Sequence, residues 1–116
     1  MSLEEILELQ KELDLKITLN VFGVSEEAAK LYQKALLAKR LLALQVEVSE
    51  LANATKCFKY WSTKPSESQE RLLDEFADIL HFVFSVANSL DFTAKEIEDA
   101  YLKKHEENYK RQQEGY

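Results

Sequence analysis

Two pairs of carboxylates stand out because each lies beside an apolar run rather than in a polar stretch. Glu47 and Glu50 are three residues apart in "LLALQVEVSELANA", and Glu75 and Asp78 are three apart in "DEFADILHFVFSVA". Residues three apart on a helix are neighbours on its surface. The spacing therefore predicts two acidic pairs on two helices, each bordered by side chains that belong in a core.

Four carboxylates that face one another in a partly buried site would repel strongly, so such a group must bind protons or cations. Hard divalent cations prefer oxygen ligands, with Mg²⁺ first and Mn²⁺ second. The charge of the four side chains balances two Mg²⁺ ions. We therefore expect Glu47, Glu50, Glu75 and Asp78 to bind two or more Mg²⁺ ions.

Other metals fit the residues less well. Zinc is not expected, because Cys57, His81 and His105 do not have the spacing of a zinc ligand set. A di-iron carboxylate site is a weaker alternative, since Asp78 and His81 form a DxxH but the first acidic pair has no matching histidine. Either pair could also lie on an ordinary solvated helix face, and the pattern alone leaves that alternative open.

The elements that carry these pairs are predicted to be helices. Only 2 of the 116 residues are Gly and 1 is Pro, which excludes a β protein with many turns. Apolar periodicity predicts four helices, over residues 2–14, 25–56, 66–90 and 94–112. An irregular connection is expected at residues 15–23, between the first and second helices. The second helix is long for a globular protein, and a break near Arg40 is the alternative. Short links indicate an all-α, antiparallel four-helix bundle that forms a single domain, residues 1–116.

Capping residues support these boundaries. Ser25 precedes two acidic residues, as is typical of a helix start. Ser66 with Gln69, and Thr93 with Glu96, have the spacing of a capping box. We therefore expect the third and fourth helices to begin close to Ser66 and Thr93.

The third predicted helix indicates an oligomer. Between Ile79 and Val86 it is apolar on nearly all sides, and a helix of that kind is buried all round. A bundle of 116 residues has little room to bury it. We expect a second copy to cover one face, in a homodimer or a homotetramer.

Bulk composition excludes several classes of partner. The net charge of −6 disfavours nucleic acid, which normally binds a basic surface. The single cysteine fits a reducing cytoplasm, and "MSLEEILELQ" has acidic residues where a signal peptide has basic ones. No apolar stretch approaches the ~20 residues of a membrane helix. We expect a cytoplasmic protein that binds neither nucleic acid nor membrane.

Taken in order, the motifs resemble a known family. The pattern ExxE, 24 residues, ExxD resembles the all-α nucleoside triphosphate pyrophosphatase superfamily, which includes the MazG-like enzymes and the dimeric dUTPases. Four further segments resemble the dimeric dUTPase branch: "LQKELD", "ELANATKCFKYWS", "DEFADILHF" and "KKHEENYKRQQEGY". The resemblance implies a fold of MazG-like or dimeric dUTPase type. It also implies hydrolysis of dUTP, and of dUDP, to dUMP, with pyrophosphate released from the triphosphate.

The resemblance also implies roles for the acidic residues. All four carboxylates would bind magnesium, and water would attack the α-phosphorus, activated by metal and by a carboxylate. We assign that carboxylate to Glu47, with Glu50 as the second choice. Phosphoryl transfer needs little from a protein beyond positioning and charge, which suits such a site.

Phosphate binding requires cations besides the metal. Lys104, Asn108 and Arg111 have i, i+4, i+7 spacing, which places them on one helix face, and they resemble the phosphate-binding segment of the family. That segment ends in Gly-Tyr, so the resemblance extends to Tyr116. Lys59 is a further candidate. An ordinary charged helix end is the alternative for this tail.

The base would be recognised by other residues. The resemblance implies that Gln10 faces the base, and its amide offers both a donor and an acceptor. Trp61 and His81 are candidates to stack on the base, although either could instead be a core or interface residue. Asn88 is a weaker polar candidate. Asp14 stands where related proteins often have Asn.

Two further functions remain as alternatives. A relative within the superfamily would act on dCTP or on a modified deoxynucleotide. A non-catalytic helical dimerisation module would bind no metal and would tolerate Glu75→Ala. Nucleotide turnover with and without Mg²⁺ separates these possibilities.

Overall fold

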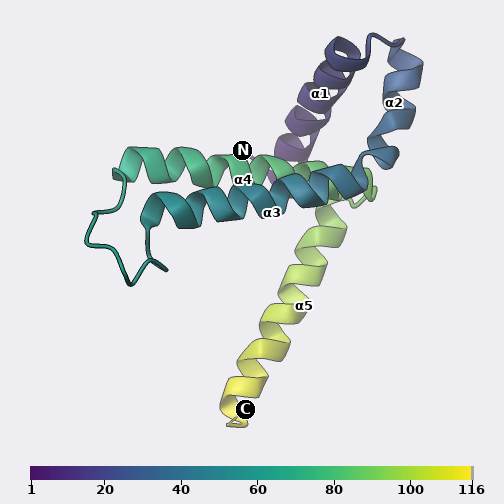
Figure 1. Ribbon diagram of the computed structural model, residues 1–116. Helices are drawn as coiled ribbons and strands as arrows, with labels where there is room; N and C mark the ends of the chain where they lie inside the picture. Colours follow the sequence, from purple (N-terminus) through teal and green to yellow (C-terminus); the bar gives the residue numbers. More distant parts are fainter. Residues whose placement is uncertain (116) are drawn as a thin grey trace.

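The computed structural model describes residues 1–115. They form five helices and no strand, which confirms the all-α class. The helices, drawn in Figure 1, are α1 (Leu3–Phe22), α2 (Glu26–Ala35), α3 (Leu37–Thr55), α4 (Gln69–Ser89) and α5 (Ala94–Gln113). None of them is long and apolar enough to cross a membrane.

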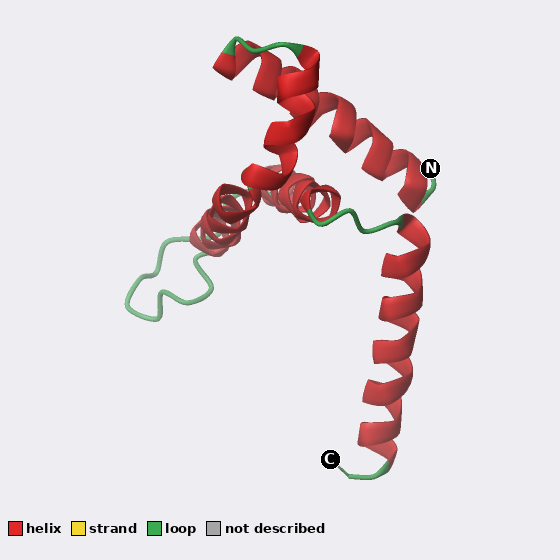
Figure 2. Ribbon diagram, turned by 90° about the vertical axis from the view of Figure 1, so that its right-hand side faces the viewer, coloured by secondary structure: helices red, strands yellow, loops and turns green. Residues whose placement is uncertain are grey.

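The centre of the fold is the antiparallel pair of α3 and α4, which lie side by side (Figure 1). The α1–α2 hairpin packs against α4. Helix α5 extends away from the rest and, among the described residues, packs only against α1 (Figures 1 and 2). The predicted four-helix bundle included the last helix, over residues 94–112, as its fourth member. In the structure the helices that pack together are α1 to α4, and α5 lies outside them.

The connection predicted at residues 15–23 is wrong, because α1 continues through it to Phe22. The β-branched residues of this segment weaken helix propensity, but burial overrides it. Thr18 is buried, and its Oγ1 donates a hydrogen bond of 2.8 Å to the carbonyl oxygen of Asp14 one turn earlier. The helix ends at Gly23, whose φ of 61° is the left-handed conformation that glycine adopts without strain.

The single helix predicted over residues 25–56 is divided at Leu36, which caps both α2 and α3. The side chain of Arg40 stabilises this break. Its Nη1 donates to the carbonyl oxygen of Gln33 at 3.2 Å, and its Nη2 donates to Gln33 Oε1 at 2.6 Å. Neither Gly nor Pro marks the position, so local sequence gives little indication of it.

Helix α4 begins three residues later than predicted. Its cap is Ser68, whose hydroxyl accepts a hydrogen bond from the backbone N–H of Arg71 at 3.2 Å. Ser66 instead belongs to the approach segment, where its hydroxyl donates to the carbonyl oxygen of Glu67 at 2.9 Å. The caps predicted at Ser25 and Thr93 are confirmed.

The interior holds more polar than apolar residues. Within residues 1–115 the buried apolar residues are Leu7, Ala29 and Ala87. The buried polar residues are Gln10, Asp14, Thr18, Arg40, Glu75, Ser85 and Ser89. Except for Glu75, these lie where α1, α3 and α4 meet, so hydrogen bonds between helices take the place of an apolar core there.

Asp14 is the centre of this network. Its Oδ1 accepts a hydrogen bond from Gln10 Nε2 at 3.0 Å, and its Oδ2 accepts one from Ser85 Oγ at 2.7 Å. Arg40 Nη2 lies 3.7 Å from the same Oδ2, and Arg40 Nη1 donates to Ser89 Oγ at 2.6 Å. Burial lowers the pKa of the Arg40 guanidinium, and the charge of Asp14 opposes that shift.

Candidate metal centre

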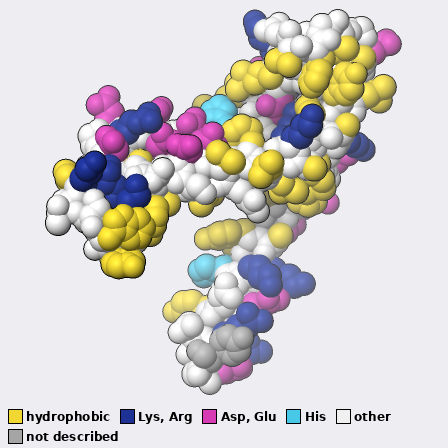
Figure 3. All heavy atoms as spheres, viewed as in Figure 1, with side chains coloured by type: hydrophobic (Ala, Val, Ile, Leu, Met, Phe, Trp, Pro, Cys, Tyr) yellow, Lys and Arg dark blue, Asp and Glu magenta, His cyan; other side chains and the backbone are white. Residues whose placement is uncertain are grey.

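Three of the four predicted carboxylates come together between α3 and α4. One oxygen each of Glu47, Glu75 and Asp78 lies within 4.8 Å of the others. The antiparallel packing places the middle of α3 against the first half of α4, which explains why residues far apart in sequence meet here. Glu75 is buried, Glu47 is half-buried and Asp78 is exposed, so the cluster opens to solvent on one side. In Figure 3 acidic side chains gather over this helix pair, with basic ones beside them.

Glu50 is not part of this close group, but its charge affects the ionisation of Glu47. Burial raises the pKa of the Glu47 carboxyl above its usual value, and the charges of Asp78, Glu75 and Glu50 raise it further. Each of these effects opposes ionisation of Glu47. A cation among the carboxylates would relieve this repulsion.

The donor set fits a hard divalent cation. All three groups are carboxylates, the open side leaves room for water ligands, and Mg²⁺ typically combines one or two carboxylates with several waters. One side chain already neutralises part of the charge: Arg71 Nη2 lies 2.7 Å from Glu75 Oε1. Arg71 was missed by the sequence analysis, although it stands one helical turn before Glu75.

A hollow of about 300 Å³ adjoins the cluster, where the end of α3, the 56–68 segment and the start of α4 meet. Its lining residues are Glu50, Asn53, Ala54, Lys56, Lys59, Glu67, Arg71 and Glu75. Lys59 therefore lines the same hollow as Glu50 and Glu75. Lys56 and Arg71 add two cations that the sequence analysis did not assign.

The candidates for base recognition do not share one location. Trp61 lies in the 56–68 segment, is 64% exposed, and packs edge-on against Phe58 and Tyr60 at ring distances of 6.0 and 5.2 Å. His81 is exposed on α4, one turn after Asp78. Neither is a core residue. Gln10, by contrast, is buried on α1, where its amide donates to Asp14.

The predicted phosphate-binding residues of the tail lie on α5, which Figures 1 and 2 show leading away from the α3–α4 pair. Lys104, Asn108 and Arg111 are all exposed, and Lys104 Nζ lies 3.5 Å from a carboxylate oxygen of Glu107. The structure of one chain therefore does not bring these residues to its own acidic cluster. Tyr116 lies outside the described residues.

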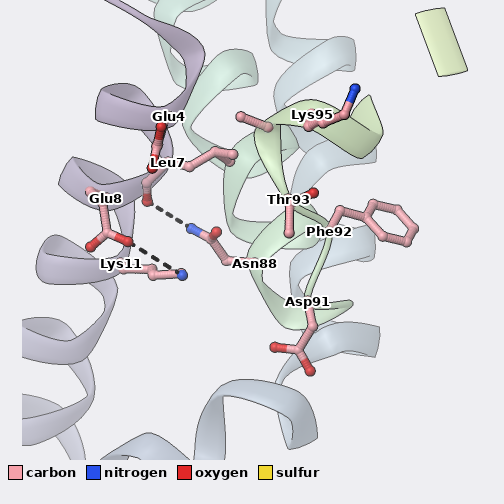
Figure 4. A pocket seen from close by; sticks show the side chains of 10 residues that line it. Glu4, Leu7, Glu8, Lys11, Asn88, Asp91, Phe92, Thr93 and Lys95 are labelled. Atoms are coloured by element: carbon pink, nitrogen blue, oxygen red, sulfur yellow. Dashed lines mark hydrogen bonds and ion pairs between the residues drawn. The ribbon is translucent and has the colours of Figure 1, made fainter. Parts of the chain in front are cut away.

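Asn88 lines a second hollow of about 300 Å³ between α1 and the α4–α5 corner (Figure 4). Its Nδ2 donates a hydrogen bond of 3.1 Å to the carbonyl oxygen of Leu7. Lys11 and Lys95 also line this hollow, and Glu8 pairs with Lys11 at 3.5 Å. Asn88 therefore joins α1 to α4 and is not part of the acidic cluster.

Comparison with known proteins relates the chain to a family and to a phage enzyme. The sequence matches the dUTPase family over residues 2–92 and 85–116, two overlapping segments that together span nearly the whole chain. It is also similar to a dCTP pyrophosphatase of Enterobacteria phage T4, at 32% identity over 75 residues that cover 54% of this chain and 44% of the relative. The chain thus spans less than half the length of that relative. No solved structure matches it.

Proposed function

The chain belongs to the all-α dUTPase family, and on this premise we propose that it hydrolyses dUTP to dUMP and pyrophosphate with Mg²⁺ as its metal. The observation that carries the proposal is the convergence of Glu47, Glu75 and Asp78, with oxygens within 4.8 Å of one another. A solvated helix face would spread these charges apart. The matched family and the matched relative are both named for hydrolysis of nucleoside triphosphates, which supports the same class of reaction.

The acidic residues would hold the metal. Glu47, Glu75 and Asp78 supply its first ligands, and Glu50, one turn from Glu47, completes the set of four for two or more ions, with Mn²⁺ as a substitute. When bound, the metal lowers the pKa of water and offsets charge on the phosphate oxygens. We assign Glu47 to accept the proton of the attacking water, with Glu50 as second choice, because the Glu47 carboxylate belongs to the cluster and is only half-buried, so a water can reach it.

Substrate binding follows from the surroundings of the cluster. Lys59 lines the same hollow as Glu75, which supports a contact between its ammonium group and phosphate. Trp61 and His81 have exposed rings on which a base can stack. Gln10 can reach the base only if its hydrogen bond to Asp14 opens, because its amide is buried in that contact.

A second candidate substrate is dCTP, and the similarity to a dCTP pyrophosphatase favours it. The same acidic cluster would serve either nucleotide, since the phosphates are alike. The difference lies in base recognition alone. The same argument extends the proposal to dUDP, which has one phosphate fewer.

We also propose that the chain works as a homodimer or homotetramer. Large apolar side chains are exposed along the central helix pair, namely Leu41, Leu42, Val46, Val48, Leu73, Phe76, Leu80 and Val83. Apolar area of this extent normally marks a protein interface.

The test is pyrophosphate release from each common deoxynucleoside triphosphate, with and without Mg²⁺, and with dUTP and dCTP in competition. Turnover of dUTP that needs Mg²⁺ is expected, with a loss of at least about 100-fold in Glu75→Gln. Asp74→Asn is the matched control, because Asp74 is the exposed neighbour of Glu75 on the same helix, and its carboxylate lies 3.6 Å from Arg71 Nη1. Preference for dCTP would support the second candidate. No release from any nucleotide would leave the dimerisation module as the function.

A further inference from the structure

Glu75 of the acidic cluster has a cationic partner on its own helix. Arg71 Nη2 lies 2.7 Å from Glu75 Oε1, and Arg71 Nη1 lies 3.6 Å from Asp74 Oδ2. The Glu75 side chain is 7% exposed, whereas that of Arg71 is 54% exposed. The carboxylate is therefore fixed by its surroundings, while the guanidinium can turn away from it. Because a buried carboxylate is costly without a counter-ion, Arg71 leaves Glu75 when another cation takes its place.

A divalent ion in the cluster would be such a cation. The oxygens of Glu47, Glu75 and Asp78 lie within 4.8 Å of one another, so an ion among them would also lie near the Arg71 guanidinium. Two cations at such a range repel each other. The divalent ion is held more strongly, because it has twice the charge and two further carboxylates attract it. Its binding should therefore displace Arg71 from Glu75.

The displaced side chain already lines the hollow of about 300 Å³ beside the cluster. The walls of this hollow are held by backbone contacts. Lys56 ends α3 in a left-handed conformation with a φ of 58°, and the backbone N–H of Glu67 donates to the carbonyl oxygen of Ala54 at 2.9 Å. These contacts bring the two ends of the segment that joins α3 to α4 close together (Figure 1). Arg71 can therefore enter the hollow without any rearrangement of the backbone.

The charge of this hollow depends on the state of the cluster. Its lining carries three cationic side chains and three carboxylates, namely Lys56, Lys59 and Arg71, and Glu50, Glu67 and Glu75. With all six ionised the charges cancel, and Lys56 Nζ lies 3.8 Å from Glu67 Oε1. A metal bound by Glu50 and Glu75 would neutralise both, which leaves three positive charges against the single negative charge of Glu67. The hollow would then attract an anion.

The proposed substrate contains an anion that suits this hollow. The Arg71 guanidinium is a planar fork of N–H donors that matches phosphate oxygens, and a lysine adds a point charge. A volume of about 300 Å³ lies at the lower end of the range for small-molecule sites and suits a short phosphate chain. Hydrolysis breaks the bond between the α-phosphorus and the bridging oxygen, and the electron pair leaves with pyrophosphate. A cation in the hollow would stabilise that charge.

We propose that Glu75 has two alternative partners, Arg71 as in the structure or a divalent ion, and that the displaced Arg71 binds the terminal phosphates of the nucleotide beside Lys56. This inference rests on the proposed function and adds to it a coupling between its two ligands. The metal frees the guanidinium that the phosphates need, and phosphate keeps that guanidinium away from the metal. By linkage, each ligand strengthens the binding of the other by the same factor.

Calorimetry of Mn²⁺ binding without nucleotide tests this coupling. Sulfate serves as the probe, because it is a tetrahedral dianion like a phosphate group and binds Mn²⁺ only weakly in water. Replacing chloride by sulfate at matched ionic strength should tighten Mn²⁺ binding by about 5-fold or more in the wild type. In Arg71→Gln the factor should fall below about twofold, because the side chain that changes partner is lost.

Two further variants separate this exchange from a general effect of charge. Lys64→Gln removes one charge from the same connecting segment, but Lys64 does not line the hollow, so this variant should keep the wild-type coupling. Arg71→Lys keeps the charge without the fork and should retain part of the coupling, which excludes a folding defect as the cause of its loss in Arg71→Gln. Coupling that is absent from the wild type, or undiminished in Arg71→Gln, overturns the inference.

Turnover gives a second readout that changes in the opposite direction. Arg71→Gln should bind Mn²⁺ more tightly than the wild type, yet hydrolyse dUTP at least about 10-fold more slowly at saturating metal, because charged hydrogen bonds to the leaving pyrophosphate are lost. A merely structural role would weaken both properties together, and that result overturns the exchange. Turnover of dUTP without coupling also overturns the exchange alone. Wild-type protein that couples sulfate to Mn²⁺ but hydrolyses no nucleotide overturns the proposed function instead.

Discussion

Replacing Arg40 by methionine should lower the free energy of unfolding by about 3–5 kcal/mol, the usual cost of breaking a buried ion pair by removing one partner. Arg40 is 8% exposed and Asp14 is also 8% exposed, so water compensates little for the loss. Methionine retains most of the aliphatic volume, and the cavity contribution is therefore small. The cost comes from polar groups that lose their partners.

Those groups can be counted in the structure. The variant loses the bonds from Arg40 to Ser89 Oγ at 2.6 Å, to Gln33 Oε1 at 2.6 Å and to the Gln33 carbonyl oxygen at 3.2 Å. It also leaves Asp14 without the positive charge 3.7 Å away. Gln33 Oε1 loses its bond from Arg40, whereas the Gln33 carbonyl oxygen keeps a bond of 2.9 Å from Ser89 Oγ. Most of the predicted range therefore comes from the buried Asp14 charge that is left without its counter-ion.

Urea unfolding followed by circular dichroism, at fixed protein concentration and without metal, measures the effect. Lys39→Met is the control, because Lys39 is the exposed neighbour on the same helix. Asp14→Asn combined with Arg40→Met should cost less than the sum of the two single changes, by about 1 kcal/mol or more. A loss below about 1 kcal/mol for Arg40→Met would refute the view that the interior depends on this network.

Three further outcomes follow from local features. The pKa of Glu47 is raised in the folded protein above its ordinary value of 4.5. The free energy of unfolding of the metal-free protein should therefore fall as the pH rises from 4.5 through the higher pKa of the folded state. Glu47→Gln should remove that loss in urea titrations across this range, and an unchanged slope would contradict the assignment. Arg71→Gln removes the cation that lies 2.7 Å from Glu75 and competes with a metal ion. Mn²⁺ should therefore bind about 3- to 10-fold more tightly, as measured by calorimetry without nucleotide. Weaker binding would mean that Arg71 instead holds Glu75 in place. Gly23→Ala should lower the free energy of unfolding in urea by about 1–2 kcal/mol, because alanine is strained at a φ of 61°. The space around a new Cβ is open, so no steric clash adds to this cost. An unchanged free energy would mean that the helix end adjusts.

The sequence contained enough information to predict the acidic cluster. Glu47 and Glu75 each stand beside apolar residues at helical spacing, which favoured two helices facing each other over a solvated face without excluding the latter. The caps at Ser25 and Thr93 were equally accessible, since capping depends on residues within one turn. Features of this kind are local in sequence or repeat with the helical period.

The interior network was not predictable in the same way. Arg40 bonds to Ser89, 49 residues later, and Asp14 bonds to Ser85, 71 residues later. The helical periodicity of the sequence does not indicate which residues so far apart will pair. The only local signal was the i, i+4, i+8 spacing of Gln10, Asp14 and Thr18, a polar stripe on a helix whose other faces are also partly polar.

The direction of α5 could not be predicted from the sequence for a related reason. The spacing of Lys104, Asn108 and Arg111 defined a face correctly, but not the surface that it meets. That depends on the corner at Asp91, where φ is 57° in a residue other than glycine and where Lys34 pairs from a different helix. A pairing between segments that distant is not encoded in the local pattern.

The small number of buried apolar residues has a calorimetric consequence. Unfolding raises heat capacity mainly by exposing apolar surface to water, about 12–15 cal/mol/K per residue in typical proteins. With Leu7, Ala29 and Ala87 as the buried apolar residues among the described ones, and the others half-buried or exposed, an isolated chain of 116 residues exposes less apolar surface on unfolding than a closely packed domain of that length. Its increment should fall well below the typical value of about 1.4–1.7 kcal/mol/K for that length, and its stability should change only gently with temperature. Association that covers the outer apolar side chains would restore the normal increment and sharpen the curvature of the stability curve.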